Sequence, residues 1–409
     1  MPALVPFRAL RPASNAVAEA LACVPYDVVS AEEARAMLAE NPASFLRVVR
    51  PDATLPEGTD EHADAVYEAG AAHLAAMGAA GDLVREAAPS LYAYRLAWRG
   101  QAMTGIFGGV SVADYDAGRI VRHELTRPDK EDDRTRHLLA QRAHAEPVML
   151  AFEDDPAVAA LVQEATAAAP LYDLTAPGAL DGDAVQHTLW RFPDDAAARL
   201  VEAFGRLPQV YVADGHHRCK AASRAFHALG GANDEAGAFP AALFPVSEMR
   251  ILPYHRVVTD VPEGFEAALR ARFDVADDPP PQPTRAGDVS VYLGAGRWAG
   301  IVLPATASDE VAGRLDVARL AEHVLAPLLD VQDARTDRRL AFVGGIRGPE
   351  ELVRRVDALA AEGRRAVAFA MFPTQMADLL AVSNAAELMP PKSTWFEPKL
   401  RSGLLVHTF

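Results

Sequence analysis

The chain alternates between short apolar runs, which predict buried strands, and alanine-rich segments whose apolar positions recur at helical spacing. The predicted strands of the first two thirds are 90–98, 102–112, 148–152, 187–192, 210–212, 241–246 and 251–258. The predicted helices there are 30–38, 64–77, 156–166, 194–204 and 219–229. The turn Arg99-Gly100 joins the first two strands into a hairpin. Ser30 and Glu33 form a capping box that starts the first helix.

The run 277–283 is rich in proline and is the clearest linker candidate, because proline cannot sit inside a sheet. The elements predicted after it are a hairpin at 294–296, helices 317–329, 349–362 and 374–388, and strands 366–372 and 404–409. This mixed order predicts an α+β (mixed α/β) fold rather than a regular doubly wound sheet. We expect one region at 1–276 and another at 284–409; the same run also fits a surface loop within one interleaved unit.

Composition narrows the class of partner. A chain of 409 residues is too long for one ordinary core, and 50% hydrophobic with 23% charged residues is typical of globular proteins. Lys and Arg number 40 against 56 Asp and Glu, a net charge of −16. This acidity disfavours nucleic acid and anionic membranes and favours small-molecule partners.

Two cysteines, Cys23 and Cys219, lie far apart, so neither a disulfide framework nor a cysteine zinc site is expected. The first residues lack the pattern of a signal peptide, and no apolar run is long enough to span a bilayer. The sequence predicts a cytoplasmic protein.

The stretch Asp214-Gly215-His216-His217-Arg218 lies between a predicted strand and a predicted helix. A glycine turn at this point directs the free amides of the helix N-terminus toward one spot, where the helix dipole favours an anion. Imidazoles can move protons, and a guanidinium can bind phosphate. We interpret the stretch as a phosphate site, against the alternative of a capping turn with exposed histidines.

Two further stretches gather cations against the acidic background. Arg122, His123 and Glu124 precede a charged loop that turns into a helix over 128–146 and carries Arg134. They indicate an anion site with Glu124 as a candidate general base. The alternative is a solvated charged loop.

The third stretch carries Lys392, Ser393, Thr394 and Lys399 on a proline-stiffened loop, which suits phosphate contact. A surface loop leading to the last strand is the alternative. Asp27 and His255 are weaker candidates, each beside a Pro-Tyr pair at the end of a predicted strand. Walker, GxGxxG, HExxH and GxSxG motifs are absent from the sequence.

Taken in order, these stretches resemble the family known as domain of unknown function 1015. The Ala-Asp-Gly-His-His-Arg run at 213–218 and the Met-Pro-Pro-Lys-Ser-Thr run at 389–394 carry the resemblance, which extends from Pro6-Phe7 to Gly403. The first run is also similar to the phosphate-binding box of the ParB/sulfiredoxin-like superfamily, whose members include free-serine kinases. Cys219 and Trp395-Phe396-Glu397 depart from the usual pattern.

This resemblance implies phosphoryl transfer to the hydroxyl of free L-serine, with pyrophosphate or a nucleotide as donor. The amides of Gly215, His216 and His217 would hold the donor, and Arg218 would neutralise its charge. Glu124 is the first candidate for the base that takes the serine proton and Asp214 the second. Mg²⁺ is expected from the chemistry, although no carboxylate cage is visible in the sequence.

Two other functions remain open at this point. A metal-dependent hydrolase would use His123, Glu124, His216 and His217 as ligands, although nearby arginines would repel the cation. A nucleotide switch or DNA-bound partitioning factor would use the same loop without catalysis, but the net acidity argues against it.

Overall fold

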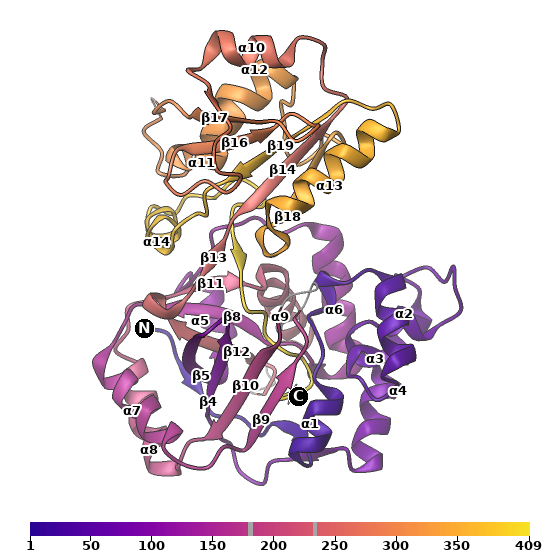
Figure 1. Cartoon of the computed structure of the whole chain (residues 1–409). Coiled ribbons are helices and arrows are strands. Elements are labelled where there is room, and N and C mark those ends of the chain that lie inside the picture. The colour runs from indigo at the N-terminus through magenta and orange to yellow at the C-terminus, as the bar shows by residue number, and fades with distance from the viewer. Residues whose placement is uncertain (179–182, 232–234, 307) are drawn as a thin grey trace. The chain divides into compact units, whose positions relative to one another are not determined.

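The computed structural model describes residues 1–178, 183–231, 235–306 and 308–409, and it divides the chain into two compact units. The first unit comprises Met1–Met249 together with Pro398–Phe409, and the second comprises Arg250–Glu397. Both units contain helices packed with sheets, which confirms the predicted α+β class (Figure 1). Within the described residues, no helix has the length and apolar character needed to cross a membrane.

The first unit is built on a mixed sheet. Its helices are α1 (Asn15–Leu21), α2 (Ala31–Glu40), α3 (Leu46–Val49), α4 (Asp64–Ala80), α5 (Val112–Asp116), α6 (Pro128–Gln141), α7 (Pro156–Thr166), α8 (Asp194–Phe204) and α9 (His216–Ala228). Its strands are β1 (Leu4–Val5), β2 (Leu10–Pro12), β3 (Leu83–Arg85), β4 (Tyr92–Trp98), β5 (Gln101–Ser111), β6 (Ile120–Val121), β7 (Ala143–His144), β8 (Val148–Phe152), β9 (Tyr172–Ala176), β10 (Val185–Arg191), β11 (Val210–Asp214), β12 (Ala238–Pro245) and β21 (His407–Thr408).

The strand order of this sheet is β6-β11-β8-β12-β5-β4-β10-β9, with β1 beside β5. The pairs β11–β6 and β12–β8 are parallel, and the other neighbours run antiparallel. One core forms where α7, α8 and α9 contribute apolar side chains against β5, β8, β11 and β12. The sequence predicted α7 and α8 because each buries one apolar face, and it predicted β8 and β11 because their apolar runs are buried almost throughout.

The second unit contains an antiparallel sheet of order β15-β17-β16-β19-β14-β18, made of β14 (Tyr254–Thr259), β15 (Ala276–Asp277), β16 (Asp288–Tyr292), β17 (Trp298–Val302), β18 (Leu340–Gly344) and β19 (Ala366–Met371). Its remaining elements are β13 (Ile251–Leu252), α10 (Phe265–Arg272), α11 (Asp316–Leu320), α12 (Ala326–Leu329), α13 (Gly348–Ala361), α14 (Met376–Asn384) and β20 (Trp395–Phe396). The strands β13 and β20 pair with each other.

The boundary predicted at the proline-rich run 277–283 is wrong. That run lies inside the second unit, between β15 and β16, and the Gln282 amide donates to the Met371 carbonyl at 2.9 Å. Most of this run is exposed or half-buried. The chain instead enters the second unit at 249–250 and leaves it at 397–398, where no compositional signal stands out.

Other differences concern the ends of elements. The charged stretch 128–146 is helical from Pro128 to Gln141, and the predicted strand 251–258 is split at Pro253 because proline cannot donate to a ladder. The predicted helix 374–388 is shorter, as α14, and the predicted strand 404–409 is reduced to β21.

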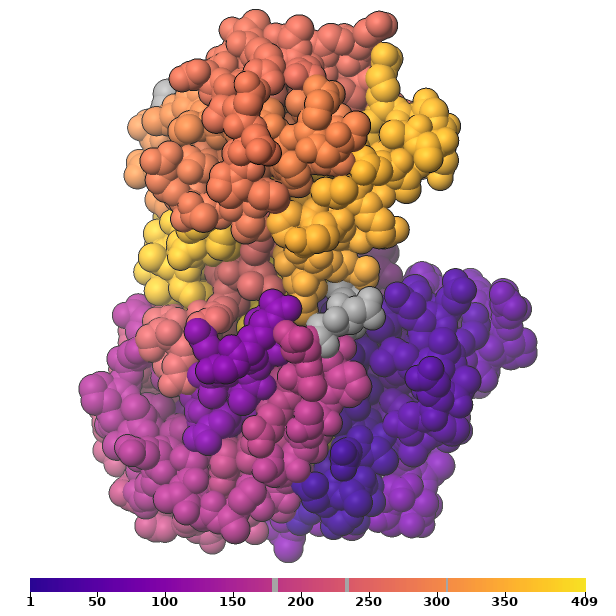
Figure 2. All heavy atoms as spheres, in the orientation of Figure 1, coloured from indigo at the N-terminus to yellow at the C-terminus, as the bar shows by residue number. Residues whose placement is uncertain are grey.

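Segment 398–409 returns to the first unit as a buried strap. Val406 exchanges two backbone hydrogen bonds with Leu10, and β21 pairs with β7. Residues 400–407 are buried, and little of this yellow segment reaches the surface of the first unit in the view of Figure 2. The strap therefore forms part of the interior of the first unit.

Gly105 in β5 marks the closest approach between two strands, and its substitution is a test of this packing. A Cβ there would lie 2.0 Å from the Leu243 carbonyl oxygen of β12. We expect Gly105→Ala to destabilise the protein by roughly 2–3 kcal/mol, because the sheet must move apart. Thermal unfolding followed by circular dichroism measures the loss.

The matched control is Gly78→Ala in α4, where no atom lies within 4 Å of the new Cβ. Alanine favours a helix over glycine by about 0.5–1 kcal/mol, so this variant should melt at or above the wild-type temperature. Equal melting temperatures for the two variants would contradict the assigned strand packing.

Candidate functional site

The loop 214–218 follows directly from an irregularity in the sheet. Val210, Tyr211 and Val212 are fully buried, and β11 pairs with β8 until the register shifts between Val212 and Asp214. Such a bulge bends a strand and turns its next side chain in a new direction. Gly215 then adopts φ +104, in the left-handed region that favours glycine. The sequence thus specifies a sharp strand-to-helix turn.

Helix α9 begins at His216 without a side-chain cap from Gly215 and with no acidic residue in its first turn. Its first amides therefore keep their partial positive charge, and the helix dipole adds to it. His216 and Arg218 are both buried in this turn. These features agree with the anion site expected from the sequence, which stays a prediction.

Asp214 is held between two cations of the same unit. Lys399 Nζ lies 3.0 Å and Arg218 3.5 Å from its carboxylate oxygens. Burial alone would raise the pKa of Asp214, but Lys399 and Arg218 together hold it well below its ordinary value. The carboxylate therefore stays ionised and anchors the strap to the turn.

Arg218 points inward. Its guanidinium donates to the Pro147 carbonyl. Burial would lower the pKa of Arg218, but Asp214, Asp27 and Glu146 together raise it above its ordinary value. The structure thus brings the candidate Asp27 near the loop, where it acts on Arg218 as a counter-charge.

Arg134 joins Arg218 around Glu146. Its guanidinium lies 2.6 Å from the Asp133 carboxylate, 3.6 Å from that of Glu146 and 3.9 Å from the centre of the Tyr26 ring. Both arginines and Glu146 line a cavity of about 30 Å³, roughly the space of one water molecule. Burial raises the pKa of Glu146 against the opposite effects of Arg218 and Arg134.

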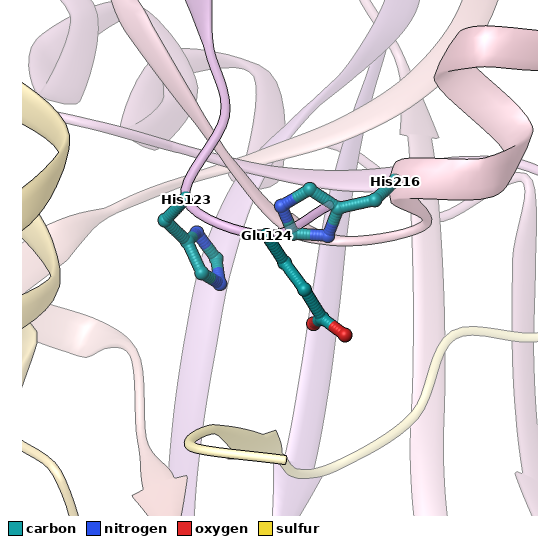
Figure 3. A group of neighbouring side chains, drawn as sticks. All are labelled: His123, Glu124 and His216. Carbon is teal, nitrogen blue, oxygen red and sulfur yellow. The ribbon is translucent and has the colours of Figure 1, made fainter. Parts of the chain in front are cut away.

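His123, Glu124 and His216 form a second group beside the same turn. Each offers one ligand atom, and these atoms lie within 4.8 Å of one another. Figure 3 shows His216 entering from the start of α9, while His123 and Glu124 come from the loop that precedes α6. The two imidazole rings meet edge to face, with 4.4 Å between the ring centres.

Both imidazoles are neutral and lack full hydrogen bonding. Burial lowers the pKa of His123 to about 4 and, together with the neighbouring His123, lowers the pKa of His216 well below its ordinary value. Among the described residues, both ring nitrogens of His123 lack a partner of normal hydrogen-bond geometry, and so does Nε2 of His216. Each such buried nitrogen costs about 1–3 kcal/mol.

The remaining residues of these stretches lie nearer the surface. Arg122 is exposed, with its guanidinium 5.2 Å from the centre of the Tyr115 ring. The amide of Arg127 donates to Nε2 of His217 at 3.0 Å, which ties the loop before α6 to the start of α9. His217 is therefore separate from the group formed by His123, Glu124 and His216.

Four predicted site residues belong to the second unit. The Lys392 ammonium lies 5.6 Å from the centre of the Tyr254 ring, and Ser393 donates to the Pro390 carbonyl at 2.6 Å, with Thr394 next in the chain. His255 is buried in β14 and accepts from the Met371 amide at 3.1 Å, and burial lowers its pKa to about 4. A shared site between these residues and the loop 214–218 stays a prediction.

Sequence reasoning missed Glu146. It lies between α6 and β8, and one of its carboxylate oxygens accepts from the Tyr26 amide at 3.0 Å. The available signal was a carboxylate followed by Pro147, directly before a fully apolar strand. At such a place a charge is buried and requires partners.

The family model described as "Protein of unknown function (DUF1015)" matches residues 4–318. No curated protein matches the chain. The chain is similar to a solved structure of SbnI with C-terminal truncation from Staphylococcus aureus, at 11% identity and TM-score 0.39, over 73% of this chain and 86% of that one.

It is also similar to a free serine kinase mutant in complex with AMP, at 11% identity and TM-score 0.37, over 71% of this chain and 86% of that one. A conserved hypothetical protein from Pyrococcus furiosus has 12% identity and TM-score 0.35, over 72% of this chain and 93% of that one. At these TM-scores, the structural likenesses carry no weight for function.

The pair between Lys399 and Asp214 leads to a pH-dependent prediction. Lys399→Met should lower the free energy of unfolding at pH 7 by roughly 2–3 kcal/mol, somewhat less than for a buried pair that loses its sole partner, because Arg218 remains. Since Asp214 has a depressed folded pKa, its contribution is present above the ordinary pKa of 3.8 and is lost as the pH falls below it.

The difference in the free energy of unfolding between wild type and Lys399→Met should therefore be complete at pH 7 and become smaller below about pH 4. Urea unfolding across this range measures it. Lys220→Met removes the same charge from α9 and should show no such pH dependence. A difference that stayed constant down to pH 3 would argue against the pair.

Proposed function

The chain belongs to the DUF1015 family, and we propose that it is a small-molecule kinase that transfers a phosphoryl group to the hydroxyl of free L-serine. The product is O-phosphoserine, and the donor is pyrophosphate or a nucleotide. The proposal combines the resemblance carried by 213–218 and 389–394 with the local geometry of the first unit.

The observation that carries the proposal is the uncapped start of α9 after Gly215. The amides of Gly215, His216 and His217 would bind the terminal phosphate of the donor. Arg218 and Lys399 are occupied by Asp214, so they would contribute positive potential and rigidity more than direct contact. A phosphoryl transfer site needs such fixed positive groups above all.

In the reaction, the serine oxygen forms a bond to phosphorus while the bond from phosphorus to the leaving oxygen breaks. The leaving phosphate or nucleotide keeps the electron pair of the broken bond. The hydroxyl proton of serine goes to a carboxylate. Glu124 is better suited than Asp214, because Asp214 is held as a low-pKa anion by two cations.

Other cations would complete the site. Arg122 is exposed beside the group formed by His123, Glu124 and His216, so its side chain can turn toward a donor. The buried Arg134 would add positive potential to the site. Lys392, Ser393 and Thr394 would act from the second unit. Asp27 is proposed to contact the amino acid. His255 is fully buried in β14 against the Met371 amide, so it stays a sequence prediction without an assigned contact.

Mg²⁺ fits the residues of this site poorly. It prefers six oxygen ligands and is usually held by one or two carboxylates and by substrate phosphates. Here Asp214 is paired with Lys399, and the carboxylate of Glu124 stands beside two imidazoles. These side chains therefore do not form an oxygen cage for Mg²⁺.

The direct test is to incubate the protein with L-serine, Mg²⁺ or Mn²⁺, and pyrophosphate, ADP or ATP in turn. We expect O-phosphoserine, identified by mass spectrometry, with at least one donor. Glu124→Gln should reduce kcat by about 100-fold or more, as for loss of a general base. Absence of phosphoserine with every donor would overturn the proposal.

The same assay separates the alternatives. Free phosphate released without phosphoserine would support a hydrolase. A nucleotide bound without turnover would support a switch.

Substitution of Gly215 tests the donor site by binding alone. A Cβ at Gly215 would lie 3.0 Å from both Arg218 Nε and Val148 Cγ1, at a backbone φ of +104. Gly215→Ala should therefore distort the first amides of α9 and weaken pyrophosphate binding roughly tenfold or more, the effect of one charge-assisted hydrogen bond. Isothermal titration calorimetry measures the affinity.

Gly230→Ala is the matched control. Gly230 has φ +83 and follows the other end of α9, with no atom within 4 Å of a new Cβ. It should carry similar backbone strain but bind pyrophosphate like the wild type. Equal weakening in both variants would mean that the loss is one of stability and not of the phosphate site.

A further inference from the structure

The poor fit to Mg²⁺ raises the question of what the group formed by His123, Glu124 and His216 is for. Two histidines and a carboxylate meet within 4.8 Å, next to the anion site (Figure 3). Several buried histidines elsewhere leave one ring nitrogen without a partner of normal geometry, whereas His123 leaves both and lies against a second such ring, that of His216. Here three ring nitrogens have no partner of normal geometry among the described residues.

We propose that His123, Glu124 and His216 bind a divalent transition-metal ion such as Zn²⁺, Mn²⁺ or Fe²⁺. Imidazole is a borderline-soft ligand that suits these ions, and two histidines with one carboxylate leave coordination positions open. Mg²⁺, in contrast, takes oxygen ligands in near-ideal octahedral geometry. The donor types of this group therefore select against Mg²⁺.

The charges around the group allow a cation. The arginines were expected to repel a metal ion. Arg218 lies against Asp214 and the Pro147 carbonyl, and Lys399 is paired with Asp214. Arg122 lies against the Tyr115 ring, and its charge also acts on His216. The ligand atom of the Glu124 carboxylate lies within 4.8 Å of those of both imidazoles.

The geometry requires a small contraction. Ligand atoms about 2.0–2.1 Å from a tetrahedral ion lie roughly 3.4 Å apart, so binding would draw the three side chains inward by about an ångström. Glu124 is half-buried on a loop and can move, whereas the two imidazoles are held by packing. A carboxylate that binds through one oxygen keeps the second, so a proton-accepting role for Glu124 remains compatible.

The experiment uses the whole protein after metal removal with EDTA and dialysis. Co²⁺ serves as the probe, because its visible absorption reports coordination by protein ligands, and Zn²⁺ is then added to displace it. We expect one Co²⁺ per chain, displaced by Zn²⁺, and no displacement by Mg²⁺ at the same concentration. An absorption spectrum equal to that of Co²⁺ in buffer would overturn the proposal.

Variants assign the ion to this group. His123→Gln and His216→Gln should each weaken Co²⁺ binding about tenfold or more, and Glu124→Gln, at a half-buried loop position, keeps the test valid if a histidine variant fails to fold. His227→Gln is the matched control, on the same helix α9 but paired with Asp116 at 2.8 Å and outside the group. Wild-type affinity in the Glu124 and both histidine variants would place the ion elsewhere and overturn the assignment.

The metal site does not depend on the proposed kinase activity, and the two can fail separately. Co²⁺ binding is measured without serine or a phosphate donor, whereas phosphoserine formation is measured without reference to Co²⁺. Metal binding without phosphoserine formation would support the metal site and overturn the proposed kinase activity. Phosphoserine formation with no bound Co²⁺ would support the kinase activity and overturn the metal site.

Discussion

The half-buried carboxylate of Asp214, paired with Lys399 and Arg218, is the interaction on which the first unit depends most. It joins the end of β11 to a lysine 185 positions further along the chain. A half-buried anion of this kind is tolerated only when its partners are in place, since a lone charge in the interior is very unfavourable. The strap 398–409 and the turn at Gly215 are therefore structurally interdependent.

The same pairing separates the groups near the turn into cations that have anionic partners and polar groups that take no part in these ion pairs. Arg218, Arg134 and Lys399 are matched by Asp214, Asp133 and Glu146, so they stiffen the base of the turn without an external anion. The start of α9 has no side-chain cap at Gly215, and buried ring nitrogens of His123 and His216 have no partner of normal geometry among the described residues. The proposed phosphate and metal sites use these groups rather than the paired cations.

The sequence predicted the strand, glycine turn and helix over 210–229 because periodicity and turn chemistry are local properties. It also placed Asp214 and Lys399 among the site residues, but it could not show that they pair with each other. Glu146 was missed because a buried charge is recognised only through its distant partners, Arg134 and Tyr26. The unit boundary at 249–250 was missed because the apolar strands β12 and β13 lie close on either side of it.

The return of segment 398–409 has a consequence for biosynthesis. The ribosome must translate all of 250–397 before Lys399 and the strap exist, so the first unit cannot close its core or neutralise Asp214 until then. During that interval the turn at Gly215 carries an unmatched charge, and the inner surface covered later by residues 400–407 is open to solvent. Part of the interior of the first unit therefore stays exposed until the inserted unit has been made.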